Sequence, residues 1–205
     1  MNNVFKEEKK AFIKAAVRAY TRGIQTGSGV NISVRIPEKK LMVVKPSGVS
    51  FIECTLNNLI VTDFDGKVIE GNLKPTREFV LHGELYKKYN SIGGIVHCHS
   101  PWSIAWSYTK KDLPVLTQHS KMKMKSAIST IDIDSPIVPK EKLSEIFKLF
   151  DKQSNLSAFI LVGHGIVAVG SDVLKAEHIA ELVEETAHIK WLHAIGKSMN
   201  IIEEK

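Results

Sequence analysis

The chain has 205 residues, of which 43% are hydrophobic and 24% are charged. These proportions are typical of a soluble globular protein with one sizeable core, and because no Pro/Gly/Ser-rich linker interrupts residues 1–205 we expect a single domain. No stretch approaches the ~18–20 apolar residues needed to cross a bilayer, so a membrane-spanning protein is excluded.

The net charge of +6 favours anionic partners, but its distribution argues against nucleic acid. The one dense basic patch, Lys121–Lys125, has no interleaved aromatic residues and matches no DNA- or RNA-binding module. We expect the excess charge to aid solubility and to attract a small anion such as a phosphorylated substrate. The first ten residues lack the apolar segment of a secretory signal, and the only cysteines are Cys54 and Cys98, so we expect a reducing cytoplasm.

The first third of the chain is expected to form one helix and three strands. Apolar residues recur at three- and four-residue spacing from Lys6 to about Ile24, which predicts an amphipathic helix. The ranges Asn31–Ile36 and Leu41–Lys45 are predicted strands of a hairpin, and Asn58–Asp63 is predicted to be a third strand. A turn is expected at Asp65–Gly66.

The central part is expected to alternate helices and a buried strand. A helix is predicted over Thr76–Tyr89, with Thr76 as its cap and Glu78 in its first turn. A strand carrying His97 and His99 follows, and then a helix that begins near Ser100–Pro101. The stretch from residue 113 to residue 137 is expected to be less regular.

The last third is expected to contain two helices around one stretch of strand. Lys140–Asp151 is a predicted amphipathic helix, and Ala158–Val169 is predicted strand. Asp172 is expected to cap a long final helix with an apolar face that comprises Leu174, Ile179, Val183, Ala187, Trp191 and Ile195. This order of elements predicts an α/β fold in three layers, with helices on both faces of a largely antiparallel sheet.

Three histidines lie where apolar segments end. His97 and His99 follow the apolar run Ile92–Val96, and His164 interrupts a second one. Side chains at positions i and i+2 of a strand point to the same face, roughly 6.5–7 Å apart, so both imidazoles can bind one divalent ion. A third imidazole from a neighbouring strand leaves a coordination position open for substrate. The pattern predicts a catalytic metal centre rather than satisfied core histidines, with Cys98 facing the other side as a small core residue.

A carboxylate precedes the histidines by one predicted helix. Glu78 is the candidate acid/base, although many glutamates in a first helical turn only complement the helix dipole. His82 lies one turn further on the same side of that helix. It is predicted either to orient Glu78 or to be a buried neutral residue, and the sequence does not separate the two.

Three segments offer groups that bind anions. The loops Gly27–Asn31 and Lys45–Gly48 contain glycines whose backbone N–H groups can hold a phosphate. The start of the helix at Thr76–Arg77 offers further N–H groups, and the Arg77 guanidinium can bind an anion with two hydrogen bonds. Together with the histidines they predict a site for a phosphorylated substrate.

These segments come in the order, and at roughly the spacing, found in a known family. The chain resembles the class II aldolase/adducin family, which includes L-fuculose-phosphate aldolase and L-ribulose-5-phosphate 4-epimerase. The resemblance covers nearly the whole chain. It is carried by the segments Asn31–Arg35, Lys45–Gly48, Thr76–Glu78, His97–His99 and Leu161–Gly165.

The resemblance implies a three-layer α/β/α fold, a homotetramer with sites between subunits, and an enzyme. It implies that His97, His99 and His164 hold Zn²⁺ or another divalent cation such as Mn²⁺ or Co²⁺, and that Glu78 is the acid/base. It also implies a phosphorylated sugar as substrate, bound by residues that comprise Asn31, Ser47, Gly48, Thr76 and, at a position where the family often has serine, Arg77. The reaction would then be the cleavage of a ketose 1-phosphate into dihydroxyacetone phosphate and an aldehyde.

The resemblance leaves the reaction open between two branches. Aldolases carry glutamate at the position of Glu78 and epimerases usually carry aspartate, whereas Lys45–Val49 and Ser91–Trp102 look more like the epimerase branch. The tyrosines that both branches use are not found, since no tyrosine follows Tyr108. We favour an aldolase, with an epimerase or a methylthioribulose-phosphate dehydratase as alternatives. A non-catalytic, adducin-like interaction domain is the alternative from another class, and the three histidines with Glu78 argue against it.

Overall fold

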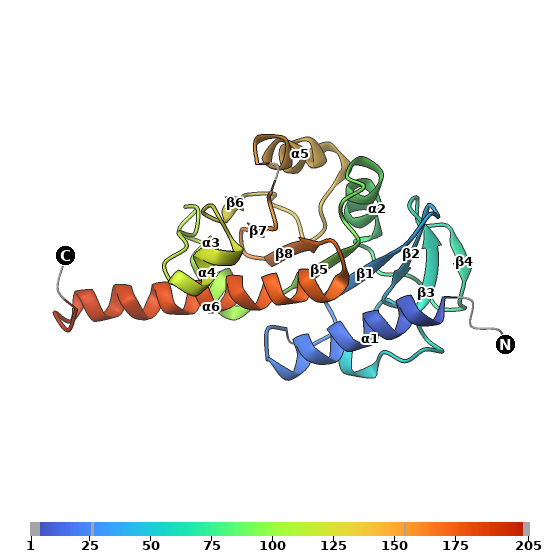
Figure 1. Ribbon diagram of the computed structural model, residues 1–205, viewed down its shortest axis with the longest axis horizontal. Coiled ribbons are helices and arrows are strands. Elements are labelled where there is room, and N and C mark those ends of the chain that lie inside the picture. Colours follow the sequence, from blue (N-terminus) through green and yellow to red (C-terminus); the bar gives the residue numbers. More distant parts are fainter. Residues whose placement is uncertain (1–4, 26, 154, 203–205) are drawn as a thin grey trace.

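The computed structural model describes residues 5–25, 27–153 and 155–202 (Figure 1). Residues 1–4, part of the segment inspected for a secretory signal, lie outside this range. The helices are α1 (Lys6–Thr21), α2 (Phe79–Lys88), α3 (Pro101–Ser107), α4 (Gln118–Lys123), α5 (Leu143–Lys152) and α6 (Val173–Ser198), with 3-10 turns at Phe51–Glu53 and Lys140–Lys142. The strands are β1 (Asn31–Ile36), β2 (Leu41–Val44), β3 (Ile60–Asp63), β4 (Val68–Glu70), β5 (Gly94–Cys98), β6 (Ser129–Ile131), β7 (Ala158–Leu161) and β8 (Gly165–Gly170).

The eight strands form one sheet in the order β4-β3-β2-β1-β5-β8-β7-β6. Neighbouring strands are antiparallel except β6 and β7, which are parallel. β5 lies in the middle, between β1 and β8, so its residues are covered on both edges by backbone hydrogen bonds. The predicted β1–β2 hairpin and the largely antiparallel sheet are confirmed.

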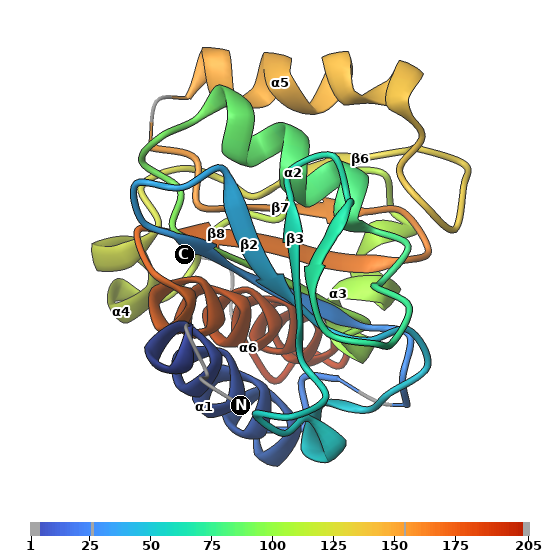
Figure 2. The ribbon, with the colours of Figure 1, turned by 90° about the vertical axis from the view of Figure 1, so that its right-hand side faces the viewer.

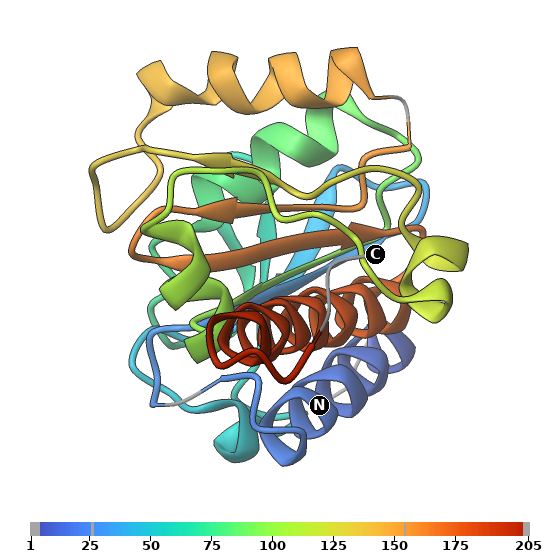
Figure 3. The ribbon, with the colours of Figure 1, turned by 90° about the vertical axis from the view of Figure 1, so that its left-hand side faces the viewer.

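Helices cover both faces of the sheet, as Figures 2 and 3 show: α1 and α6 on one side, α2 and α5 on the other. Alternate residues of β5 enter the two cores. Val96 and Cys98 pack with α1 and α6, whereas Ile95 packs with α2 and α5. The three-layer α/β prediction is confirmed, and Cys98 is a buried core residue on the face expected for it.

Some elements differ from the prediction because they carry little periodicity. The range 113–137 contains α4, only six residues long and capped by the Thr117 side chain, and the three-residue β6. β4 also has three residues, and its Val68 and Ile69 are exposed, so no buried pattern marks it. The range Ala158–Val169, expected to supply strand, contains two strands, β7 and β8, joined by a tight turn.

The long final helix begins as predicted, because the Asp172 side chain accepts a hydrogen bond from the backbone N–H of Lys175 at 2.9 Å. Its predicted apolar face is partly wrong: Val183 and Ala187 are buried, but Ile195 is 47% exposed. Figure 1 shows the reason, since the C-terminal turns of α6 run past the end of the sheet. Within the described ranges, no helix is long and apolar enough to cross a membrane.

Candidate metal centre

Three imidazoles converge at the C-terminal end of the central strand β5. His97 belongs to β5, His99 follows its last residue, and His164 lies in the turn between β7 and β8. The pairing of Cys98 with Ile166 carries that turn to the same end of β5. The ring centroids are 4.6–5.0 Å apart, and one ring nitrogen of each histidine lies within 4.8 Å of the others. The structure therefore brings together the three residues that the sequence singled out, although His99 and His164 lie outside the strands.

Burial keeps these rings neutral, and a backbone hydrogen bond fixes the tautomer of His97. His97 Nδ1 lies 2.9 Å from the carbonyl oxygen of Ile166, which can only accept, so Nδ1 donates. His97 Nε2 is then unprotonated and carries the lone pair that a metal ligand needs. Burial lowers the pKa of all three imidazoles, that of His97 well below its usual range and that of His164 to about 4.

The spacing of the nitrogens fits a divalent cation. His97 Nε2 and His164 Nε2 are 3.3 Å apart. Two nitrogens bound at ~2.0–2.1 Å to a tetrahedral ion lie about 3.3 Å from each other. His99 Nε2 is buried without a hydrogen-bond partner. Three neutral imidazoles suit Zn²⁺ and other borderline cations, and leave at least one coordination position free.

Glu78 is a buried carboxylate. It is 5% exposed, and burial raises its pKa to about 7, against the opposing effect of a hydrogen bond from the Val138 backbone. Its oxygens are not part of the histidine cluster. The carboxyl group can thus exchange a proton near neutral pH, which is the property of an acid/base.

The predicted start of α2 is wrong by three residues. The helix begins at Phe79, with Glu78 at the N-cap position, and the Thr76 side chain does not cap it. The cause is backbone pairing that keeps the preceding chain extended: Pro75 bridges to Pro46, and the Thr76 N–H donates to the Lys45 carbonyl at 2.9 Å. Thr76 is consequently held beside the Lys45–Gly48 loop rather than in a helical turn.

His82 is a buried neutral residue. Its side chain is fully buried, which lowers its pKa to about 3, and its Nδ1 lies 2.7 Å from Ser33 Oγ. Ser33 Oγ is in turn 2.8 Å from Tyr86 Oη. His82 Nε2 has no partner, and no hydrogen bond joins His82 to the Glu78 carboxylate. Sequence reasoning missed Ser33 and Tyr86. The only signal was spacing: Ser33 lies two residues after Asn31 on the same strand, and Tyr86 lies four residues after His82 on the same helix.

Asn31 lies directly beside His97. The two residues are opposite each other in the β1–β5 ladder, so their side chains emerge on the same face of the sheet. Asn31 is fully buried, and neither atom of its amide has a hydrogen-bond partner. A buried amide without partners is rare, because each unmade hydrogen bond costs free energy. The residue offers both a donor and an acceptor next to the histidines.

The three candidate anion segments adjoin one another. The Lys45 ammonium, 1% exposed, donates to the carbonyls of Ser28 and Val49 and so connects the first two loops. The Ser47 N–H donates to the Lys74 carbonyl at 2.8 Å, which brings the segment before Thr76 alongside. Sequence reasoning did not foresee the burial of Lys45, because a lysine after an apolar strand normally reaches solvent.

The first loop also abuts the histidines. A Cβ added to Gly29 would lie 2.9 Å from His99 Cε1, so only glycine allows this close approach. Gly48, at φ +75°, is likewise in a conformation that favours glycine. Ser47, Gly48 and Arg77 are exposed, whereas Thr76 is buried. The loops thus present polar groups to solvent next to the candidate metal centre.

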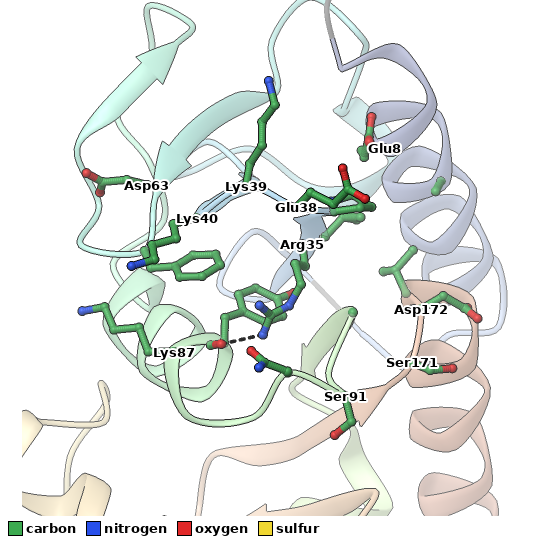
Figure 4. A pocket seen from close by; sticks show the side chains of 18 of the residues that line it. Glu8, Arg35, Glu38, Lys39, Lys40, Asp63, Lys87, Ser91, Ser171 and Asp172 are labelled. Atoms are coloured by element: carbon green, nitrogen blue, oxygen red, sulfur yellow. Dashed lines mark hydrogen bonds between the residues drawn. The ribbon is translucent and has the colours of Figure 1, made fainter.

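A large cavity lies at the opposite end of β5. Its volume is about 1080 Å³, and it surrounds the half-buried Arg35 (Figure 4). Arg35 Nε donates to the Ile92 carbonyl at 2.6 Å, and one terminal nitrogen donates to the carbonyls of Tyr86 and Tyr89 at the end of α2. Arg35 therefore caps α2 and has a structural role. None of the three histidines lines this cavity.

The chain matches known proteins over most of its length. Residues 10–191 match the family described as Class II Aldolase and Adducin N-terminal domain. The chain is 30% identical over 195 residues to L-ribulose-5-phosphate 4-epimerase UlaF of Salmonella paratyphi B, which covers 89% of this chain and 83% of that protein.

Two solved structures are also similar. One is an L-fuculose 1-phosphate aldolase, with 27% identity, a TM-score of 0.81 and coverage of 96% of this chain and 88% of that one. The other is YgbL, a putative aldolase/epimerase/decarboxylase from Escherichia coli, with 25% identity, a TM-score of 0.80 and coverage of 92% and 90%. The chain belongs to the class II aldolase and adducin family.

Proposed function

We propose that the chain is a divalent-metal-dependent aldolase that cleaves a ketose 1-phosphate into dihydroxyacetone phosphate and an aldehyde. The single observation that carries the proposal is the 3.3 Å spacing of His97 Nε2 and His164 Nε2, which matches two ligands of one tetrahedral cation. The similar proteins named above act on phosphorylated sugars according to their names, which supports the substrate class.

In this proposal His97, His99 and His164 hold the cation, with Zn²⁺ as the first candidate and Mn²⁺ or Co²⁺ as alternatives. When bound, the cation acts as a Lewis acid that polarises the oxygens of the substrate. The phosphate is bound by residues that comprise Asn31, Ser47, Gly48, Thr76 and Arg77, of which Ser47, Gly48 and Arg77 are exposed and Asn31 and Thr76 are buried. Lys45 supports phosphate binding, because its buried ammonium group donates two hydrogen bonds that hold the loops together.

Glu78 moves the proton. A carboxyl group with a pKa of about 7 is populated in both forms at neutral pH, so it can accept a proton in one direction and return it in the other. The Val138 backbone bonds the carboxylate, but burial is the larger effect and keeps the pKa raised. His82 remains neutral and buried behind the site, where its bond to Ser33 keeps α2 against β1.

An L-ribulose-5-phosphate 4-epimerase activity is the second candidate. The observation in its favour is the 30% identity to UlaF over 89% of the chain. An epimerase breaks the C3–C4 bond and remakes it after the aldehyde has rotated, so the aldehyde is not released and the same metal ligands and acid/base serve both reactions. The two activities differ in what leaves the site and in which fragment carries the phosphate.

The decisive experiment supplies the purified chain with Zn²⁺, Mn²⁺ or Co²⁺ and a panel of ketose 1-phosphates together with L-ribulose 5-phosphate. Release of dihydroxyacetone phosphate, measured with a coupled reduction, supports the aldolase. Inversion at C4 without release, measured by NMR, supports the epimerase. His97→Ala is the matched control, and equal turnover by this variant would refute both proposals.

The proposal includes a homotetramer with sites between subunits. The end of α6 supports an oligomer, because Leu192, Ile195 and Met199 are 47–63% exposed on turns that project past the sheet (Figure 1). Exposed apolar residues that gather on one helix often mark contact surfaces. Light scattering coupled to gel filtration should give about four times the mass of one chain. A monomer at assay concentrations would contradict this part of the proposal.

A further inference from the structure

Glu184 of α6 is a buried carboxylate that binds the first turn of α3. It is 8% exposed, and its two oxygens accept three hydrogen bonds. Oε1 accepts from the backbone N–H of Trp102 at 2.9 Å, and Oε2 accepts from the N–H and the hydroxyl of Ser103 at 2.9 and 2.7 Å. No cationic side chain within the described residues pairs with it, so these bonds compensate the burial of its charge.

These bonds replace the cap that the helix's own sequence would supply. The first N–H groups of a helix have no partner within it, and a serine at the N-cap usually satisfies one of them. Ser100 holds that position in α3, but its hydroxyl donates instead to the Ile24 carbonyl at 2.6 Å. Glu184 therefore caps α3 from another helix, and its negative charge also complements the positive end of the α3 dipole.

The capped turn adjoins His99 directly. The ladder between β5 and β8 ends at Cys98, so His99 lies beyond the strand and immediately before the N-cap of α3. The Ser100 hydroxyl bonds the segment that precedes Gly29. The Glu184 carboxylate bonds the two residues after Pro101. The Trp102 ring also stacks on His188 of α6, with centroids 4.1 Å apart and planes 10° apart.

We propose that Glu184 is a positioning residue for the metal centre, which acts by holding the backbone on the C-terminal side of His99. The inference rests on the proposed function, because it assumes that His99 is a ligand. Removal of the carboxylate would free two N–H groups of α3 and widen the range of positions that the His99 ring adopts. The cation would then lose affinity and change its geometry, although no ligand has been removed.

The test is a titration of the metal-free chain with Co²⁺, whose visible absorption reports both affinity and ligand geometry. Glu184→Gln is expected to weaken the Co²⁺ affinity about tenfold, the lower end of the effects seen for residues that support metal ligands. Its absorption bands should also shift. Glu177→Gln is the matched control: Glu177 is a fully buried acid on the same helix, but it bonds Arg18 of α1 at 2.8 Å. It should leave the Co²⁺ titration unchanged.

Three results would overturn the inference in different ways. Wild-type affinity and spectrum in Glu184→Gln would refute the positioning role and leave the proposed function intact. An equal loss in Glu177→Gln would mean that any destabilisation of α6 has this effect. A wild-type chain that takes up no Co²⁺ would refute the proposed function and this role with it. If Glu184→Gln does not fold, Ser103→Ala removes only the hydroxyl bond, and it should weaken Co²⁺ about threefold if the role is correct.

Discussion

The two ends of β5 differ in how their polar groups are satisfied. At the cavity end, Arg35 donates to three carbonyls, and Lys87 pairs with Asp65 and Glu84. None of the residues that line the cavity contains a buried side-chain nitrogen or oxygen without a partner. At the histidine end, the opposite holds. Buried polar atoms without partners occur there on Asn31, His82, His99 and His164.

This difference separates a structural cavity from a candidate site. A buried polar atom without a partner destabilises the fold, so a cluster of them indicates groups that are satisfied by something else. The cavity is large, but Arg35 lies over the neighbouring rings of Phe64 and Tyr86, at 5.3 and 4.7 Å from their centroids, and donates to three backbone carbonyls. The grouping of such atoms around the histidines, rather than the empty volume around Arg35, therefore marks the candidate site; others occur at Gln25, Thr62, Glu177, Glu181 and Trp191.

The largest expected effect is the loss of metal in His97→Ala. The substitution removes the central ligand, and we expect affinity for Zn²⁺ to fall by more than about 100-fold, beyond the range seen when only supporting residues are changed. Catalytic activity should disappear with it. Metal content after dialysis, measured by mass spectrometry, checks the prediction, and a full equivalent in the variant would show that His97 is not a ligand.

Glu78→Gln separates proton transfer from metal binding. The amide has the shape of the carboxyl group but cannot exchange a proton, so turnover should fall by ~10²–10⁴-fold while metal content is unchanged. Steady-state kinetics of the metal-loaded variant measure the loss. A decrease of less than about threefold would remove Glu78 from the mechanism.

The raised pKa of Glu78 also predicts a dependence of stability on pH in the metal-free chain. Between pH 4.5 and about 7 the folded state keeps a proton that the unfolded state has lost, so this group makes folding less favourable as the pH rises through that window. The full effect is about 3 kcal/mol. Glu78→Gln should therefore exceed wild type in stability at pH 8 but not at pH 4.5, as measured by urea unfolding. A constant difference between the two proteins would contradict the burial of an ionisable Glu78.

Arg35→Ala should produce the smallest functional effect. It removes hydrogen bonds to three carbonyls, so we expect the free energy of unfolding to fall by about 2 kcal/mol. Metal affinity and turnover should stay at wild-type values, because the guanidinium lies at the other end of β5. Thermal unfolding and the Co²⁺ titration give both readings. A loss of metal affinity would show that the two ends are coupled and that their comparison is not valid.

Much of the fold follows from apolar periodicity in the sequence. The strand Asn31–Ile36 carries it clearly and agrees with the prediction, and the apolar run Ile92–Val96 predicts a strand where β5 lies, although His99 falls outside it. The last turns of α6 extend beyond the sheet, so the apolar residue Ile195 has no core to enter. Short elements such as β4 and α4 depend on neighbours distant in sequence, and no local pattern reveals them.

The candidate site was predicted in part for the same reason. Residue type and spacing singled out the three histidines and Glu78, but their spacing within a strand did not indicate that His99 lies beyond it. The contacts that hold the site cross long distances in sequence. Lys45 reaches Ser28, Ser33 joins His82, and Glu184 reaches Ser103. Such pairs depend on how the sheet and helices assemble, which a local pattern does not specify.

X-ray absorption spectroscopy at the zinc edge tests the central claim most directly. The account predicts one Zn²⁺ per chain, bound by three imidazole nitrogens at ~2.0–2.1 Å with the remaining ligands oxygen. His164→Ala should remove one imidazole from that count. A spectrum that fits fewer than two imidazoles, or a wild-type chain that retains no zinc, would contradict it.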